Sequence, residues 1–200
     1  MSPMSQTLEA AIHEAGAALA ASPRGDLPRS HREAIWIALG HPDGDGRRRR
    51  TRLGRFAVEE VLPVWESSWP GDRTPRRLLA LADAVLEGKT GREEGVRLRN
   101  QSFDAVDDLS NRSRDKIPVG VGYAAAQTVS TALGDEALNP KEVHPDLDDD
   151  DVEPEEHDPS YFAAAVRAGG PPWDPASSVE RRRAFWEWWL AEAVPAAAHA

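Results

Sequence analysis

Hydrophobic and polar residues follow one another with the period of an α-helix along most of this chain. The first apolar stripe, with spacings of four, three and four positions, occupies one face of a helix near the N-terminus. Its members are Leu8, Ile12, Ala15 and Leu19. Similar stripes recur towards the C-terminus, and no segment alternates strictly between apolar and polar residues. The pattern therefore predicts helices and no β-strand.

Helix start and stop signals divide this pattern into separate elements. Three capping boxes, in which a Ser or Thr precedes a Glu by three positions, indicate helix starts. They are Ser30 with Glu33, Thr90 with Glu93, and Ser177 with Glu180. Thr74 before Pro75 and Asp158 before Pro159 are two further expected N-caps. Glycines that follow the apolar stripes indicate helix ends, at Gly40, Gly88, Gly134 and Gly169.

These elements predict an all-α fold, with a single domain over residues 1–200 built as a bundle of about eight helices. Because the connections are short, the helices can be arranged as antiparallel pairs. Residues 135–157 are expected to form an acidic connecting segment within that domain. The helix that begins near Pro118 is rich in alanine, which should let a neighbouring helix approach closely.

Tryptophan is unusually frequent, with seven residues against four Phe and two Tyr. The densest string is Phe185-Trp186-Glu187-Trp188-Trp189-Leu190, where Phe185, Trp188 and Trp189 share one helical face. We interpret this helix as one that closes the hydrophobic core, and we expect Trp188 and Trp189 to be largely buried. A partner-binding hot spot is the alternative, because Trp is over-represented at such sites.

Several classes of protein are disfavoured by what the chain lacks. Without cysteine it has no disulfide, no thiolate nucleophile and no Cys-ligated zinc, which is compatible with a reducing compartment. The first residues lack the basic start and apolar run of a signal peptide. No window approaches the ~18–20 apolar residues that span a bilayer. We therefore expect a cytoplasmic protein that does not enter a membrane.

The negative charge of the chain is concentrated in one place. The formal net charge is −10, yet residues 135–158 contain twelve acids and a single base, Lys141. This stretch alone carries −11, so the rest of the chain is close to neutral. The acidity is therefore a property of the connecting segment and not of the protein as a whole.

The run Asp148-Asp149-Asp150-Asp151 is the first candidate for a metal site. Calcium loops place oxygen ligands at alternate positions and need a glycine for the sharp turn. Here four acids are contiguous and no glycine interrupts them, so only weak, non-specific calcium binding is expected. The six histidines show no ligand spacing, and we interpret most of them as surface residues. No P-loop, dinucleotide fingerprint or Gly-x-Ser-x-Gly elbow occurs, so neither a cofactor nor enzyme activity is expected.

A basic run, Arg47-Arg48-Arg49-Arg50, lies at the start of a predicted helix and continues with Arg52 and Arg55. Nucleic-acid binding is one interpretation. A chain with a net charge of −10 repels phosphate at long range, however. We favour a solvated face or an internal ion-pair partner for the acidic segment, and we expect no nucleic-acid partner.

Several strings together resemble one known family. They are Arg52-Leu-Gly-Arg-Phe-Ala-Val-Glu-Glu-Val-Leu-Pro-Val-Trp-Glu66, Pro70-Gly-Asp-Arg-Thr-Pro75, Tyr161-Phe-Ala-Ala-Ala-Val-Arg-Ala-Gly-Gly170 and Phe185-Trp-Glu-Trp-Trp-Leu-Ala-Glu-Ala-Val-Pro195. The chain is similar here to the fifth numbered family of bacterial immunity proteins from polymorphic-toxin systems, a family described as mostly α-helical. The resemblance covers residues 50–135 and 158–195, and the first 45 residues and the acidic segment lie outside it.

The resemblance implies a non-enzymatic protein that binds a cognate bacterial toxin and neutralises it. The concentrated acidity suits a basic toxin domain, and nucleases are the favoured class because enzymes that handle phosphate backbones are commonly basic. Opposite charges would also speed the capture of the toxin. The candidate partner-binding residues are Asp146, Asp148, Asp149, Asp150, Asp151, Glu153, Glu155 and Glu156.

Two alternatives stay open at this point. The acidic segment can instead be a solvated linker, folded back on the arginines at 47–50. The whole chain can instead be a helical small-molecule-binding or regulatory domain, which would need an apolar pocket.

Overall fold

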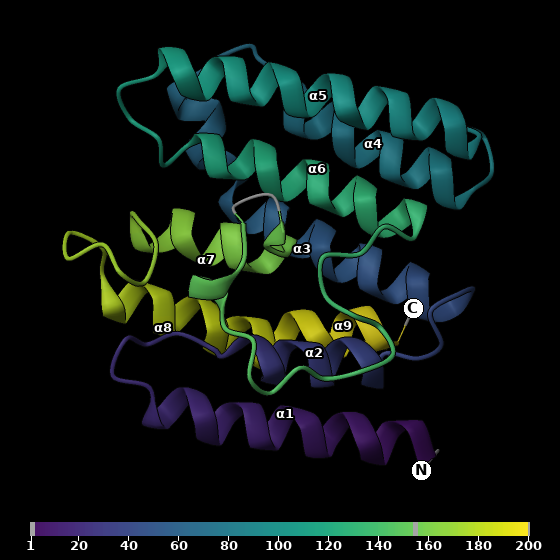
Figure 1. Ribbon diagram of the computed structural model, residues 1–200, viewed down its shortest axis with the longest axis vertical. Helices are drawn as coiled ribbons and strands as arrows, with labels where there is room; N and C mark the ends of the chain where they lie inside the picture. Colours follow the sequence, from purple (N-terminus) through teal and green to yellow (C-terminus); the bar gives the residue numbers. More distant parts are fainter. Residues whose placement is uncertain (1–2, 154–155, 200) are drawn as a thin grey trace.

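The computed structural model describes residues 3–153 and 156–199, which form helices joined by loops (Figure 1). Within these ranges there is no β-strand, and the all-α prediction is confirmed. The helices are α1 (Pro3–Ala21), α2 (Arg29–Ala38), α3 (Asp45–Ser68), α4 (Thr74–Leu86), α5 (Arg92–Arg112), α6 (Val119–Leu133), α7 (Pro159–Ala168), α8 (Val179–Trp188) and α9 (Val194–Ala198).

The last two α-helices form one continuous rod. A π-helical turn, η3 (Trp189–Ala193), joins α8 directly to α9, so the described residues contain eight helical rods, as expected. The wide turn lies immediately before Pro195. A proline ring clashes with the carbonyl four residues earlier in a regular α-helix, and a local widening of the helix relieves that clash.

The helices are stacked along the long axis of the molecule, with α1 at one end and α4 and α5 at the other (Figure 1). Short loops connect α4, α5 and α6, so that each helix runs antiparallel to the one before it. The central element is α6, which packs against α3, α4, α5 and α7. On the other side, α1 packs against α2 and α8, and α9 packs against α3.

Small residues allow α6 to occupy this central position. Thirteen of its fifteen residues are buried, so the helix is covered on every side. A Cβ atom added at Gly122 would lie 2.8 Å from Val106 Cγ2 and 3.0 Å from Trp65 Cζ3. The expected close approach of neighbouring helices is thus confirmed. Neither α6 nor any other helix in the described ranges is long and apolar enough to cross a membrane.

The core position of the last helix is confirmed in large part. Trp186 and Trp189 are fully buried and Phe185 is nearly so, whereas Trp188 is only half-buried. The first stripe is also in the core, where Leu8, Ala15 and Leu19 are buried. Both ends of the chain therefore contribute side chains to one continuous hydrophobic cluster.

The capping predictions have a mixed outcome. Asp158 caps α7 as expected, since its Oδ1 atom accepts hydrogen bonds from the backbone N–H groups of Ser160 and Tyr161. The expected third box is displaced by one residue, because Ser178 and not Ser177 caps α8. Gly134 and Gly169 end α6 and α7 in the left-handed conformation, where glycine is favoured.

The other two capping boxes are wrong. The N-cap of α2 is Pro28 and that of α5 is Gly91, and neither makes a side-chain cap hydrogen bond. Ser30 lies inside α2, and the Glu33 carboxylate is buried against other elements. A tertiary contact has thus overridden a local pattern.

The segment between α6 and α7 is almost entirely irregular. Its described part includes a short 3-10 turn, η1 (Asp149–Asp151). From the end of α6 the chain passes along α2 and then returns to α7 (Figure 1). This route places the acidic segment beside the buried charges described next.

Candidate functional site

Helix α2 presents a charged face to the acidic segment. Arg29, Arg32 and Glu33 are all buried, although helix α2 also carries core residues such as Trp36. Arg29 donates from Nη2 to the carbonyl of Ala137 at 2.6 Å. The Glu33 Oε2 atom accepts the backbone N–H of His144 at 2.7 Å. These contacts fix the backbone of the segment and satisfy charges that would be costly to bury alone.

The strongest anchor of the segment is the fully buried Arg32. Its Nη1 and Nη2 atoms donate to the two Asp149 oxygens at 2.9 and 2.6 Å, and its Nε donates to Asp158 at 2.9 Å. The guanidinium also lies near the rings of Tyr161 and Trp186, at 5.7 and 5.5 Å from their centroids. Burial by itself would raise the pKa of Asp149. The charge and hydrogen bonds of Arg32, together with the nearby His157 and Arg29, outweigh burial and hold this pKa below its ordinary value.

A second buried ion pair joins the start of the segment to α3. Arg50 donates from Nε and Nη2 to the Glu136 carboxylate at 2.6 and 3.0 Å, and both side chains are almost completely covered. Burial raises the pKa of Glu136, and the hydrogen bonds and charge of Arg50 offset only part of that effect. The ion-pair interpretation of the basic run is confirmed for Arg50. Its neighbour Arg47 pairs with Asp43 instead.

The structure separates the predicted partner-binding residues into two groups. Asp149 is 4% exposed and lies in the Arg32 pair, so it faces the interior. The exposed members are Asp146, Asp148, Asp150, Asp151, Glu153 and Glu156. Glu155 lies outside the described residues. The segment therefore holds most of its acids towards solvent, while Asp149 and Glu136 anchor it.

Local hydrogen bonds shape the exposed part of the segment. Asp148 Oδ1 accepts the N–H of Asp149 at 2.9 Å, and Asp151 Oδ2 accepts the N–H of Asp148 at 3.1 Å. These two bonds close the η1 turn as a capping box. Asp150 makes a surface ion pair with Arg24 at 3.3 Å. The contiguous carboxylates consequently point in different directions and do not converge on one point.

The buried pairs of Arg32 were missed from the sequence, although one signal for them exists. Arg32 lies three positions before Ile35 and four before Trp36, which puts it on the apolar face of α2. A charged residue at such a position needs a buried partner. The pattern does not say which of the many acids is that partner, because Asp149 is 117 positions away.

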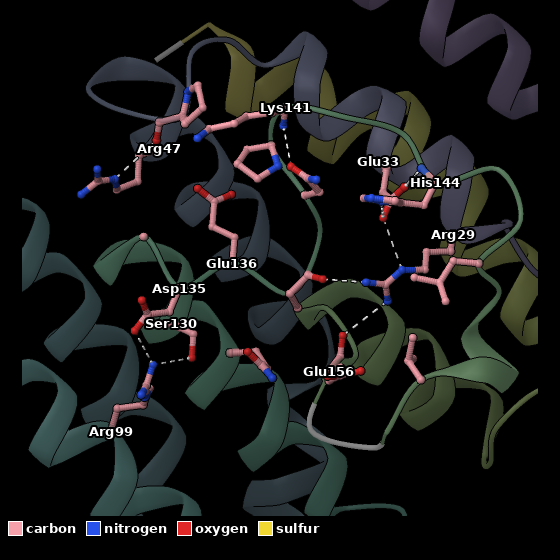
Figure 2. A pocket seen from close by; sticks show the side chains of 18 of the residues that line it. Arg29, Glu33, Arg47, Arg99, Ser130, Asp135, Glu136, Lys141, His144 and Glu156 are labelled. Atoms are coloured by element: carbon pink, nitrogen blue, oxygen red, sulfur yellow. Dashed lines mark hydrogen bonds and ion pairs between the residues drawn. The ribbon is translucent and has the colours of Figure 1, made fainter.

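A large polar cleft separates the acidic segment from α5 and α6. Its volume is about 1140 Å³, and Figure 2 shows its two walls. On one wall, Arg99 of α5 donates to Asp135 and Ser130. On the other, Arg29 of α2 lies beside Glu33. The charged residues of the lining are of both signs: Glu33, Asp43, Asp107, Asp135, Glu136 and Glu156 against Arg29, Arg47, Arg99 and Lys141.

A smaller, mainly apolar pocket lies on the other side of η1. Its volume is about 410 Å³, and residues of η1, α6, α7 and the α7–α8 loop line it. We call it the aromatic pocket and define it by Tyr123, His157, Tyr161, Phe162 and Trp173. His157 is buried and stacks on Tyr161, so the expectation of a surface position is wrong for this histidine.

The comparison with known protein families agrees with these observations. The family described as "Immunity protein Imm5" matches residues 12–196, which include every helix from α2 to α8 and the whole acidic segment. The chain belongs to the Imm5 immunity protein family. The match starts earlier than the resemblance in the sequence suggested and takes in residues 135–157 as well. No curated protein matches the chain.

Membership of Imm5 places the acidic segment inside the family domain. The segment is held by α2 and α3, both of which lie in the matched range. Within the described ranges, no group of three or more His, Asp or Glu side chains is positioned to hold a metal ion. The site presents exposed carboxylates on the acidic segment and apolar rings in the aromatic pocket.

Proposed function

We propose that this Imm5 protein confers immunity by binding and neutralising a cognate bacterial toxin, without catalysis of its own. The observation that carries this proposal is the family match over nearly the entire chain. A structural feature supports it: six of the predicted partner-binding acids are exposed, on a segment whose backbone is fixed by buried ion pairs. A fixed binding surface loses less conformational entropy on association than a flexible one.

The partner that suits this surface is a basic toxin domain, with nucleases the favoured class. Exposed carboxylates on one segment create a negative potential that attracts a cationic partner and raises the association rate. Fast capture is useful in an antidote, since the toxin has to be blocked before it acts in the cytoplasm of the cell. Asp149 contributes indirectly, because its pair with Arg32 holds the neighbouring acids in place.

The large cleft gives less support to catalysis or to a charged small ligand. Its charged groups are of both signs and pair with one another, as Arg99 does with Asp135 at 2.9 Å and Arg47 does with Asp43. Ion-paired walls leave little net potential to attract a charged substrate. We therefore assign no ligand to the cleft.

Toxin capture can be tested with two triple variants that remove the same charge from different faces. Asp146→Asn, Asp150→Asn and Glu153→Gln remove three negative charges from the acidic segment and leave the η1 capping box intact. The matched control is Glu14→Gln, Glu187→Gln and Glu192→Gln, which are exposed acids of α1 and of the C-terminal rod. The ligand is an inactivated toxin domain encoded beside this gene.

We expect the segment variant to associate about tenfold more slowly at low salt, and its association rate to depend less on salt concentration. The control variant should change the rate much less. Equal rates and salt slopes in the two variants would remove the acidic segment from the interface. An absence of binding, and no protection of cells that express the toxin, would refute the immunity function itself.

A further inference from the structure

The aromatic pocket is the part of the surface that the charge argument does not use. Residues of the α5–α6 loop and of the α7–α8 loop line it, and both loops lie on the left side of the molecule in Figure 1. Its rings form a nearly continuous layer. Tyr123 stacks on Phe162 with centroids 5.4 Å apart, and Tyr161 stacks on both His157 and Trp173, at 4.0 and 6.5 Å.

One wall of this pocket is unusually exposed. Trp173 is 53% exposed and is the one large hydrophobic side chain left in solvent among the described residues. A single surface Trp needs no explanation by itself. Here, however, the exposed ring borders an apolar pocket of about 410 Å³, so the apolar surface continues from the rim into the hollow. Such an arrangement is typical of the pockets that receive anchor residues at protein interfaces.

The acidic segment forms the opposite wall. Asp150 and Val152 line the pocket, and the exposed carboxylates of Asp148 and Asp151 flank Asp150 in the η1 turn. Lys116 is the basic residue of the lining, but the acids of η1 outnumber it. An occupant of the pocket would therefore have mainly negative charges close beside it. A partner segment that combines an apolar side chain with neighbouring basic side chains matches both features.

We propose that the aromatic pocket receives an apolar side chain of the toxin, from a segment whose flanking Lys or Arg side chains pair with the exposed acids of η1. This inference rests on the proposed function, and it specifies where the toxin is anchored. The acids guide the approach of the partner, and the pocket retains it once bound. Charge at the rim of an interface acts mainly on the association rate, whereas a buried apolar anchor acts mainly on the dissociation rate.

A small molecule is the other class of occupant that such a pocket can hold. Its volume lies at the lower end of the roughly 300–1,000 Å³ that is usual for small-ligand sites. Those sites bury most of the ligand surface, whereas here a half-exposed indole forms the rim. The exposed rim and the adjoining row of carboxylates favour a protein partner.

Two substitutions test the anchor without disturbing the core. Trp173→Ala removes the exposed wall, and the position is too exposed for this change to unfold the protein. Ala165→Phe fills the pocket from α7, where Ala165 is half-buried. The matched control is Ala80→Phe, at an exposed position of α4 outside the pocket. Circular dichroism and thermal unfolding verify that each variant is folded.

Dissociation of the inactivated toxin domain is then measured for each variant over a salt series. We expect Trp173→Ala and Ala165→Phe to dissociate at least about tenfold faster with an unchanged salt slope, and Ala80→Phe to behave as the wild type. If the wild type binds the toxin and both pocket variants dissociate at its rate, the anchor proposal is wrong and the immunity function stands. Binding of the apolar dye anilinonaphthalene sulfonate is measured for the same variants. If they lose dye binding but keep the toxin dissociation rate of the wild type, the pocket holds small molecules and the proposal is likewise wrong. A wild type that binds no toxin overturns both proposals.

Discussion

At the scale of single residues, the fold depends on charges inside the protein as well as on apolar contacts. All the nitrogen atoms of the Arg32 guanidinium donate hydrogen bonds within the protein, to Asp149, Asp158 and the carbonyl of Leu27. Burying one such group costs free energy unless every donor has a partner. Arg32 comes close to this condition, because four of its five N–H groups donate hydrogen bonds and two carboxylates balance its charge. In doing so it joins α2 to η1 and to the N-cap of α7.

Replacement of Arg32 should therefore be among the most damaging changes in the chain. Arg32→Met leaves the carboxylates of Asp149 and Asp158 buried without their cation, which is expected to lower the free energy of unfolding by about 3–5 kcal/mol. Urea denaturation measures this loss. Asp146→Asn, in the exposed part of the same segment, should change stability by less than about 0.5 kcal/mol. Equal effects of the two changes would contradict the role of the buried pair.

The lowered pKa of Asp149 also predicts a dependence of stability on pH. A carboxylate whose pKa is depressed by folding stabilises the protein above its unfolded pKa of about 3.9, and this contribution is lost as the pH falls through the folded value. The difference in unfolding free energy between the wild type and Asp149→Asn should be constant from pH 7 to about 5 and should shrink below about pH 4.

Comparison with the variant reports mainly on this group. Burial raises the pKa values of Asp26 and Glu136, which act on stability in the opposite sense. The Glu136 contribution cancels between the two proteins, whereas the pKa of Asp26 falls somewhat in the variant, because the Asp149 charge is a smaller cause of its elevation. Urea titrations at a series of pH values supply the measurement. A difference that widens on acidification would show that the sign assigned to Asp149 is wrong.

At the scale of elements, the arrangement depends on how closely other helices approach α6. Gly122 lies against Val106 of α5 and Trp65 of α3, and Gly54 of α3 lies against Thr128 of α6. Glycine lowers the stability of a helix interior by roughly 0.5–1 kcal/mol relative to alanine. At these crossings the cost is offset by the contacts that a missing side chain permits.

This trade-off predicts opposite outcomes for one type of substitution at two places. Gly122→Ala adds a methyl group 2.8 Å from Val106 Cγ2, and we expect it to destabilise the protein by about 1–3 kcal/mol. Gly16→Ala in α1 has no neighbouring atom within 4 Å, and it should stabilise by up to about 1 kcal/mol through helix propensity. Thermal unfolding of both variants checks this. A stabilising effect of Gly122→Ala would contradict this prediction, because it would mean that α6 does not need its close contact with Val106 and Trp65.

At the scale of the whole molecule, the uneven charge is partly neutralised within the fold. Glu136, Asp149 and Asp158 belong to the acidic stretch but are buried in ion pairs with Arg50 and Arg32. The acids that remain exposed lie on the outer side of a segment which these same pairs hold in place. Part of the charge concentrated in the sequence thus anchors the segment, and the rest stays exposed to solvent, where we propose that the partner binds.

The sequence by itself determined the class of the fold, the family and most of the helices. These properties depend on patterns that span a few turns of helix, such as the stripe at Leu8 and Leu19 or the cap at Asp158, and short-range spacing is visible in one dimension. The same local rules failed at Ser30 and Thr90, because α2 and α5 begin at other residues. At Ser30 the partner expected for the box, Glu33, instead accepts a hydrogen bond from the distant His144.

Only the tertiary structure decided which acids are anchors and which are exposed. The sequence shows twelve similar carboxylates, and nothing local distinguishes Asp149 from Asp150, although one is buried and the other is not. Their fates differ because the chain brings Arg32 to one of them from 117 positions away. The aromatic pocket likewise combines Tyr123 with Trp173, fifty positions later in the chain. Long-range pairing is set by the packing of whole helices, so no local pattern can specify it.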